Sequence, residues 1–264
     1  VNPYVNFSDL AWFEFALPPI EEQRSIVRTL MAAERMSESL FAQERACVAA
    51  SRAWLHDRLS VDDPKWRLWA TSDLLAEPPR NGLSPTTNDD GRGIRTISIS
   101  SVSHGRLSIG GHTKFADVSR SNAEPYFIRK GDAFAIRGNG NRYLMGTVGM
   151  CHEAPKEVFY PDLLIRLRFD SSLIDPILAV AQWNLPSVHL GLVSRGKSSN
   201  GIWKINGQDI RAHRLIVPPL GQQAALVTRL RQFHASQRSI SLRLEQAKIF
   251  KKGLVATALG DSPE

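Results

Sequence analysis

Two stretches of the sequence, offset by 200 residues, repeat each other without a gap. Residues 5–20 read VNFSDLAWFEFALPPI and residues 205–220 read INGQDIRAHRLIVPPL. Each stretch ends in a proline pair, at residues 18–19 and 218–219. An ungapped match with both proline pairs in place rarely arises by chance, so we infer an internal duplication. Whatever the chain folds into must use the same local structure twice.

Each copy predicts a short strand followed by a long helix. Alternating or continuous apolar residues, such as Phe13, Phe15 and Leu17, predict the strand, and the proline pair ends it. Proline is tolerated in the first turn of a helix because its missing N–H would be unpaired there. About 40 residues without an interior proline follow each pair, which predicts helices about 60 Å long.

Apolar residues seven positions apart run along both predicted helices, which indicates a coiled-coil seam. The two rows are Ile26, Ala33, Leu40, Cys47 and Trp54, and Leu226, Phe233, Ile240, Ala247 and Leu254. Leu30 and Leu230 occupy companion positions. We therefore predict an antiparallel pair with Cys47 at the level of Phe233 and Ala33 at the level of Ala247. The alternative is that each helix lies alone on a surface.

The region between the helices has the texture of a separate α+β domain. Turn residues are dense, and short apolar runs between them predict strands at 94–99, 134–136, 144–148 and 163–167. Residues 173–194 have a helix-like pattern that runs up to Leu185-Pro186. We expect a curled, mixed sheet with its own core.

The net charge of the chain is +7, and the excess is uneven. Residues 61–218 carry +5 and residues 219–260 carry +6, whereas residues 19–60 are neutral. A basic chain of this size favours polyanions, above all nucleic acid. No apolar run is long enough to span a membrane, no secretory signal is visible, and two distant cysteines suit a reducing compartment, so we expect a cytoplasmic protein.

Three turn segments rich in Arg, Asn, Ser and Gly are candidates for contacting DNA: residues 80–82, 137–143 and 195–204. Arg and Lys bind guanine or phosphate, Asn pairs with adenine, and glycines let a backbone approach closely. The alternative is that these are solvated loops. The predicted contact residues are Arg80, Asn81, Arg95, Arg137, Asn139, Asn141, Arg142, Tyr143, Arg195, Lys197, Ser198, Ser199, Asn200 and Lys204.

Catalytic and metal-binding signals are weak, and we assign no catalytic or metal-ligating residue. The run from Gly191 to Ser198 fits the phosphate-loop pattern G-x4-G-K-S literally, but Ser199-Asn200-Gly201 is a poor helix start. The seven histidines show no HExxH spacing and there is no CxxC, so zinc is not expected. A nucleotide-binding enzyme remains an alternative.

The segments LPPIEEQRSIVRTL (17–30) and VPPLGQQAALVTRL (217–230) resemble the conserved regions of specificity (S) subunits of type I restriction–modification systems. Trp66, the Lys130-Gly131-Asp132 turn and the Tyr-Pro-Asp-Leu-Leu stretch at 160–164 resemble the target-recognition domain of that family. Gln222-Gln223 departs from the Glu-Gln of the first copy.

The resemblance implies an organisation in five parts. These are the terminal strand of a preceding recognition domain (1–18), a first conserved helix (19–60), a target-recognition domain (61–218), a second conserved helix (219–260) and a tail (261–264). The predicted seam between the helices comprises Ile26, Leu30, Leu40, Trp54, Leu226, Phe233, Ile240 and Leu254.

The resemblance also implies a function without catalysis. Subunits of this kind read a split double-stranded DNA target with two recognition domains held apart by the helices. They join methyltransferase (M) subunits, which use S-adenosylmethionine, and a motor-nuclease (R) subunit, which uses ATP and Mg. We expect no cofactor on this chain itself. Because only one full recognition domain is visible, the chain is expected to be half of a subunit, able to pair with a second copy, or part of a larger protein. Alternatives are the recognition tail of a fused methyltransferase–nuclease and a coiled-coil adaptor with no DNA role.

Overall fold

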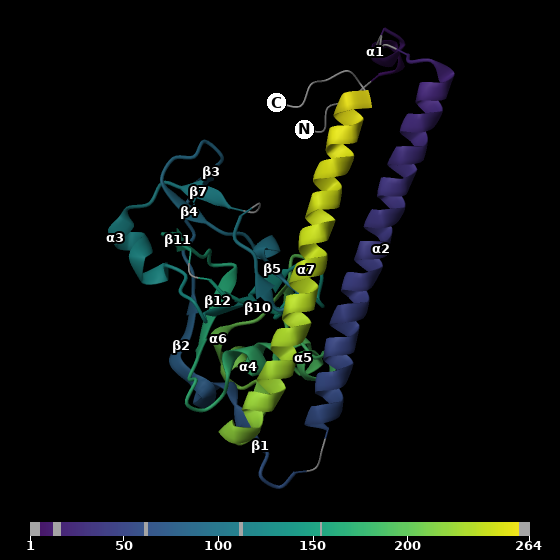
Figure 1. The fold of residues 1–264 in the computed structure, drawn as a ribbon. Helices are drawn as coiled ribbons and strands as arrows, with labels where there is room; N and C mark the ends of the chain where they lie inside the picture. Colours follow the sequence, from purple (N-terminus) through teal and green to yellow (C-terminus); the bar gives the residue numbers. More distant parts are fainter. Residues whose placement is uncertain (1–5, 13–16, 61–62, 111–112, 154, 259–264) are drawn as a thin grey trace. The chain divides into compact units, whose positions relative to one another are not determined.

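The computed structural model describes residues 6–12, 17–60, 63–110, 113–153 and 155–258 (Figure 1). The chain divides into two compact units, one made of residues 1–49 and 233–264 and the other of residues 50–232. Two long helices, α2 (Ile20–Leu59) and α7 (Leu220–Ala258), each contribute residues to both units. A short helix, α1 (Phe7–Ala11), precedes α2.

In the first unit, α2 and α7 pack against each other in antiparallel directions (Figure 1). Glu44 accepts a hydrogen bond from the Ser241 hydroxyl at 2.7 Å, and Glu34, earlier in α2, pairs with Lys251, later in α7. The Cys47 thiol donates to the backbone oxygen of Phe233 at 3.7 Å, the level predicted from the seven-residue rows. The antiparallel coiled coil is therefore confirmed.

The seam of this unit follows the alternating three- and four-residue spacing of a coiled coil. On α2, Ala33, Ser37 and Leu40 are buried, and on α7, Gln237, Leu244 and Ala247 are buried. Leu40 packs with Ile240, Leu244 and Ala247. Ser37 and Gln237 occupy equivalent positions of the two copies, so each helix places one polar side chain in an otherwise apolar interface.

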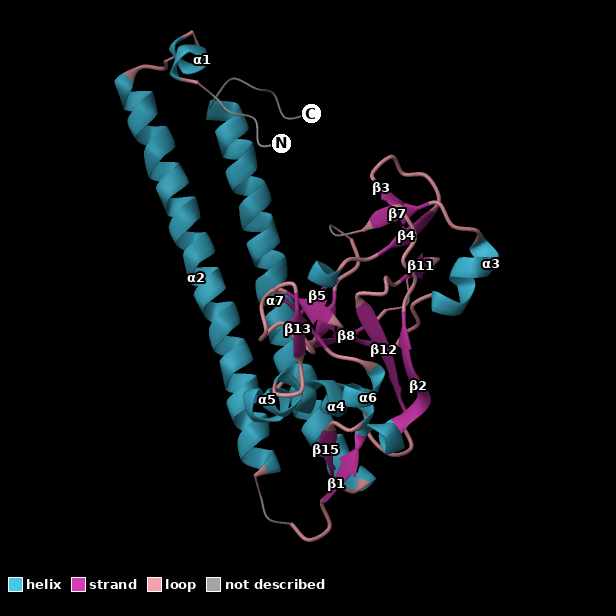
Figure 2. Ribbon diagram, turned by 180° about the vertical axis from the view of Figure 1, so that it is seen from behind, coloured by secondary structure: helices cyan, strands magenta, loops and turns pink. Residues whose placement is uncertain are grey.

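The described residues of the second unit form four sheets, in keeping with the predicted α+β class (Figure 2). The largest has the order β2-β12-β8-β10-β6-β5, with strands Leu75–Asn81, Leu164–Phe169, Ala133–Ile136, Val148–Met150, Arg106–Leu107 and Val102–Ser103. It is mixed, because β12 is antiparallel to β2 and β8 whereas β10 is parallel to β6.

Three smaller sheets complete this unit. The four-stranded sheet is β11-β4-β7-β3, with strands Val158–Phe159, Ile94–Thr96, Lys114–Ala116 and Thr87–Asn88. The three-stranded sheet is β13-β14-β9, with strands Lys197–Ser199, Ile202–Lys204 and Gly138–Asn139. The two-stranded sheet pairs β1 (Arg67–Ala70) with β15 (Arg214–Val217).

Short helices connect these sheets. They are α3 (Arg120–Ala123), α4 (Pro176–Trp183), α5 (Pro186–Val193), α6 (Gly207–Arg211) and the 3-10 turns Thr71–Leu74, Ile99–Ser101 and Glu124–Tyr126. The helical pattern at 173–194 is divided in two. Pro186 starts α5, because a proline fits the first turn of a helix but not its interior. Asp175 caps α4 by accepting the backbone N–H of Ile177 at 2.8 Å.

The core of the second unit lies between α4 and the central strands. Ala179, Val180 and Trp183 of α4 are buried with residues of β8, β10 and β12. A second cluster joins Leu178 of α4 to Leu55 of α2 and Leu230 of α7. The ends of the two long helices therefore share a core with the domain between them.

Two predicted strands are shorter than expected. The strand predicted at 94–99 ends at Thr96, and Ile99 begins a 3-10 turn. The sequence pattern predicts a strand at 144–148, but β10 begins only at Val148. Gly146 has a φ of +76°, a left-handed conformation that interrupts an extended strand, and its N–H donates to Ile136 O at 2.8 Å.

The two copies of the repeat share structural details beyond the long helices. Helix α1 at Phe7–Ala11 and helix α6 at Gly207–Arg211 are offset by the same 200 residues. The side-chain amides of Gln23 and Gln223 donate to the carbonyls of Pro18 and Pro218, at 2.7 and 2.8 Å. Residues 13–16, which carry most of the strand predicted in the first copy, lie outside the described residues, and this strand stays a prediction.

Candidate nucleic-acid interface

The three-stranded sheet brings together two segments that are about 60 residues apart in the chain. Asn139 of β9 lies opposite Trp203 of β14, and Gly138 lies opposite Lys204. On the other side of β14, Ser198 and Lys197 of β13 lie opposite Trp203 and Lys204. The segments 137–143 and 195–204, both candidates from sequence, thus form one surface.

Asparagine side chains shape the loop that follows β9. The side-chain oxygen of Asn139 accepts the N–H of Asn141 at 2.8 Å, and that of Asn141 accepts the N–H of Tyr143 at 2.9 Å. These two turns use the side-chain oxygens of the asparagines and not their amide nitrogens. Tyr143 is 66% exposed.

Arg142 is held in place by an aromatic partner. Its guanidinium carbon lies 4.6 Å from the centre of the Trp203 ring, and its Nη2 donates to the backbone oxygen of Val193 at 3.4 Å. Trp203, half-buried against the main core, was missed by the sequence analysis. An aromatic residue next to Lys204 on a short strand was the available signal. The stack and this hydrogen bond help to orient the guanidinium before any ligand binds.

Arg137 is less exposed than the basic residues of the hairpin. It is half-buried and pairs with Asp162 at 3.5 Å. Its backbone oxygen accepts the N–H of Ile205 at 2.9 Å, which fastens β14 to the end of β8.

The hairpin from β13 to β14 turns through two residues, Asn200 and Gly201. Their φ angles are +50° and +74°, as a type I′ turn requires, and Asn-Gly is the sequence that favours this turn. Arg195, Lys197, Ser198, Asn200 and Lys204 are exposed, while the side chain of Ser199 lies outside the described residues. The hairpin therefore exposes Lys197 and Lys204 on the two strands that this turn connects.

The third segment lies at the same end of the six-stranded sheet as Arg137. Strands β2 and β8 run in the same direction because both are antiparallel to β12. Asn81 lies opposite Ile165, which lies opposite Ala135, so the last residues of β2 and β8 share one end of the sheet. Arg80 is exposed and stacks 4.2 Å above the ring of Tyr126.

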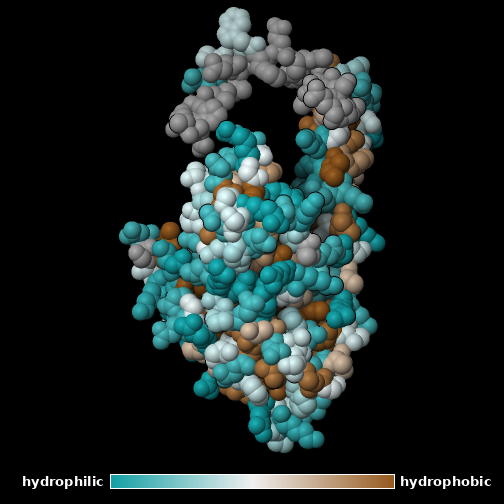
Figure 3. Space-filling view, turned by 90° about the vertical axis from the view of Figure 1, so that its left-hand side faces the viewer, coloured by the Kyte–Doolittle hydropathy of each residue, from teal (hydrophilic) through white to brown (hydrophobic). Residues whose placement is uncertain are grey.

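Arg95 belongs to a different sheet. It lies on β4 and its Nη2 donates to Lys156 O at 3.1 Å. In Figure 3, hydrophilic residues (teal) predominate over much of the face shown, and hydrophobic residues (brown) gather in patches.

A network of charged side chains supports the strands behind this surface. Asp132 is 1% exposed and accepts two hydrogen bonds from Arg168, at 2.7 and 3.1 Å. Glu77 pairs with both Arg166 and Arg168. Partial burial opposes ionisation of Glu77, but these hydrogen bonds and charges hold its pKa below the usual value. The alternating charges let β2 and β12 carry ionised residues beside Asp132, which immediately precedes β8.

The coiled-coil residues predicted from sequence differ in burial. Leu40, Leu226 and Leu230 are buried, and the others are half-buried: Ile26, Leu30, Trp54, Phe233, Ile240 and Leu254.

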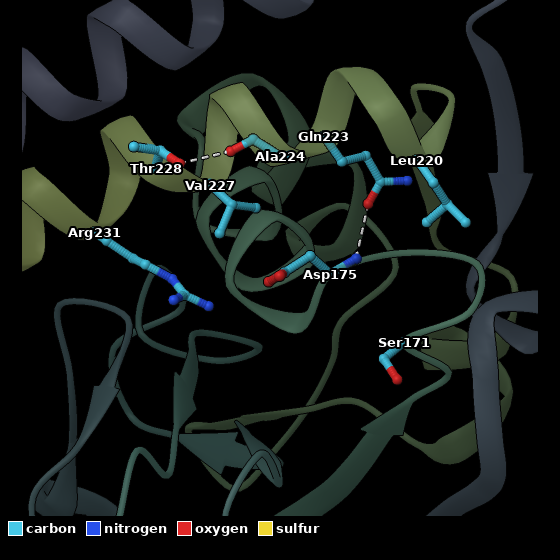
Figure 4. A pocket seen from close by; sticks show the side chains of 8 residues that line it. All are labelled: Ser171, Asp175, Leu220, Gln223, Ala224, Val227, Thr228 and Arg231. Atoms are coloured by element: carbon cyan, nitrogen blue, oxygen red, sulfur yellow. Dashed lines mark hydrogen bonds between the residues drawn. The ribbon is translucent and has the colours of Figure 1, made fainter.

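A separate cavity of about 320 Å³ lies at the start of α7, beside the loop before α4 (Figure 4). Its lining includes Asp175, Gln223, Thr228 and Arg231, and Gln223 accepts the N–H of Asp175 at 2.8 Å. None of the residues 191–198 lines it.

The phosphate-loop alternative has the wrong local structure. A phosphate loop follows a strand and opens a helix. Gly191 instead lies in α5 and Lys197 begins β13, so a helix leads into a strand. Within the described residues, no three His, Cys, Asp or Glu side chains are grouped to hold a metal ion. No helix in the described part of the chain is long and apolar enough to cross a membrane.

The fold, with two long antiparallel helices and an α+β domain between them in the sequence, is similar to that of solved type I restriction–modification S subunits. A solved S subunit from M. genitalium matches with a TM-score of 0.60 and 14% identity, covering 98% of this chain and 66% of that one. A second match is a chain from a structural study of complex assembly and conformational transition in the type I R-M system. Its TM-score is 0.50 and its identity 18%, covering 92% of this chain and 60% of that one. At these identities the two matches establish the fold.

The sequence match points to the same class. The chain is 26% identical over 249 residues to the specificity subunit of the type I restriction enzyme EcoKI from Escherichia coli K12. That match covers 88% of this chain and 53% of the relative, so the chain spans about half the length of the curated protein. No family model matches. The resemblance seen in the repeated proline segments is confirmed.

Proposed function

We propose that this chain is a DNA-binding specificity subunit, or half of one, of a type I restriction–modification system. The observation that carries the proposal is the three-stranded sheet, which joins segments 137–143 and 195–204 into one basic surface. The similarity to the EcoKI specificity subunit supports it. With one recognition domain, the chain reads one half of a bipartite target.

The surface suits double-stranded DNA in its chemistry. Arg142 offers a guanidinium already oriented by Trp203, and such a group bonds guanine or phosphate. The exposed residues of the hairpin supply further positive charge and hydroxyl groups for the phosphate backbone. The chain contributes recognition and no catalysis. S-adenosylmethionine, ATP and Mg are bound by the methyltransferase and motor-nuclease partners.

The test is binding of labelled duplex DNA by the wild type, by Arg142→Ala and by Lys204→Ala. Both variants should bind more weakly than the wild type. A loss at one base position identifies direct readout by Arg142, costing about 1–3 kcal/mol at that position, whereas a uniform loss with a smaller salt slope identifies a phosphate contact. Lys130→Ala is the control. Lys130 is also an exposed lysine, but it precedes β8 and so lies at the opposite end of that strand from Arg137 and the proposed surface. Unchanged affinity in both variants would contradict the proposed surface. Mapping methylated sites in a host with and without the gene then identifies the target.

The helices are the proposed docking surface for the methyltransferase subunits. In the first unit, Met31 of α2 and Leu242, Ile249 and Phe250 of α7 are each more than half exposed. Exposed apolar patches on a protein surface commonly mark a site where a partner binds. The double variant Ile249→Ser, Phe250→Ser should no longer co-elute with the methyltransferase subunit, while its DNA binding stays intact. Retained co-elution would contradict this docking surface.

A second copy of the chain is the proposed partner at the start of α2. At the start of α7, Val227 is 6% and Gln223 2% exposed, because residues near α4 cover them. At the equivalent position of α2, Val27 is 52% exposed and Gln23 is half-buried. The recognition domain of a second copy would cover this site in the same way. Sedimentation should show a dimer that Val27→Asp converts to a monomer, and a wild-type monomer at all concentrations would contradict the pairing.

A further inference from the structure

Two lysines are held directly opposite each other in the hairpin of the three-stranded sheet. Lys197 of β13 and Lys204 of β14 are cross-strand partners in antiparallel register. Directly opposed side chains lie on the same face of a sheet, with Cβ atoms about 5 Å apart. Both lysines are exposed. Like charges in this position repel each other, so the pair weakens the free hairpin.

The surroundings do not neutralise the pair. The ion pairs formed among the described residues include neither lysine. The next position across the sheet is Gly138, which has no side chain to offer. A Cβ placed on Gly138 would lie 3.3 Å from Cγ of Lys204, so the stem of that lysine extends over the glycine.

The scaffold keeps the two ammonium groups together. The Asn200-Gly201 turn sets the register of the hairpin. On β14, Trp203 points to the face opposite that of Lys204, because side chains alternate along a strand. Trp203 is anchored there by the main core and by Arg142. The lysine face is therefore turned outward.

We propose that Lys197 and Lys204 together bind one phosphate group of the backbone of duplex DNA. The inference rests on the proposed function and adds a division of labour to it. The lysine face of the hairpin holds the backbone, and the face with Trp203 supports Arg142. An anion between the two lysines removes their repulsion, so the free protein carries a strain that binding releases.

The experiment compares wild type, Lys197→Ala, Lys204→Ala and the double variant on a labelled duplex of about 30 base pairs, with salt from about 50 to 200 mM. We expect the double variant to lose about tenfold in affinity, equally for unrelated sequences. The slope of log affinity against log salt concentration should become less steep by about 0.9, the value for one phosphate contact. A flattening of about 1.8 would mean two independent phosphates and would overturn the shared site, as would an unchanged slope.

A second measurement separates this role from a structural one. Each single alanine variant should unfold at a higher temperature than the wild type, since it removes the repulsion, while binding DNA more weakly. A variant that is both less stable and weaker in binding would overturn the inference. Lys130→Ala should leave binding and the salt slope unchanged.

The outcomes also distinguish the inference from the proposed function. A wild type that binds DNA with a steep salt dependence, together with lysine variants that match it, refutes the shared phosphate site and leaves the DNA-binding function standing. A wild type with no affinity for DNA refutes both. A duplex RNA of the same sequence is the third arm, and a loss confined to RNA would overturn the assignment to DNA.

Discussion

The side chain of Gln223 makes three hydrogen bonds to backbone groups, so its removal should lower the unfolding free energy. It is 2% exposed. Its oxygen accepts the N–H of Asp175 at 2.8 Å, and its nitrogen donates to the carbonyls of Leu173 and Pro218 at 2.9 and 2.8 Å. The side chain thus joins the start of α7 to the loop before α4 (Figure 4).

Gln223→Ala leaves three backbone groups in this region without a partner. With a net value of about 1 kcal/mol for each hydrogen bond, the loss in unfolding free energy is about 3 kcal/mol. For a unit of this size, 1 kcal/mol lowers the melting temperature by about 2–4 °C, so the expected fall is about 6–12 °C. Gln223→Glu should behave similarly, because a carboxylate keeps the shape but cannot donate to the two carbonyls.

The assay is thermal unfolding followed by near-ultraviolet circular dichroism, with Gln222→Ala as the matched control. Gln222 is the preceding residue on the same helix, but it is exposed and accepts only the Trp66 indole N–H. Its removal should cost no more than about 1 kcal/mol. Equal shifts for the two alanine variants would refute the reasoning, because burial and bond number would then not govern the cost.

Two further predictions concern buried charge. Asp132→Asn should lower the unfolding free energy by about 3 kcal/mol, since Arg168 loses an ionised partner in a buried position; a urea midpoint within error of the wild type would contradict this. His213 is 4% exposed, and burial, followed by the charges of Arg195 and His189, lowers its pKa to about 4. The unfolded state therefore binds a proton at His213 near pH 6.5, whereas the folded state does so only near pH 4. The contribution of His213 to the unfolding free energy is intact above pH 6.5 and falls by about 3 kcal/mol as the pH drops to 4. Urea unfolding at pH 7 and pH 4.5 should show this loss in the wild type and a smaller one in His213→Gln; equal losses would exclude His213 as the cause.

Much of the architecture was predictable because it depends on short-range rules. A proline pair stops a strand and permits a helix to begin, so α2 and α7 start one residue after residues 19 and 219. Apolar residues seven apart predict a partner helix, and Leu40 and Leu244 are buried together. The prediction of a strand at 144–148 was wrong in its first part, because Gly146 adopts a left-handed conformation that an apolar pattern does not reveal.

The candidate surface was only partly visible in the sequence. Segments 137–143 and 195–204 stand out by composition, but nothing local indicates that Asn139 pairs with Trp203. Arg95 has the same chemistry as Arg142 and lies on another sheet. Residue type predicts what a side chain can bind, and it does not predict which side chains are neighbours.

The local rules and the long-range contacts thus account for different features of this protein. Proline, the heptad spacing and the Asn200-Gly201 turn act over a few residues, so the helices and the hairpin could be inferred from the chain alone. The opposition of Lys197 to Lys204 also follows from that turn once its register is known. The stack of Arg142 on Trp203 and the burial of Asp132 beside Arg168 arise only when distant strands pair. Such pairing depends on how apolar surfaces meet across the whole domain, and no short stretch of sequence encodes it.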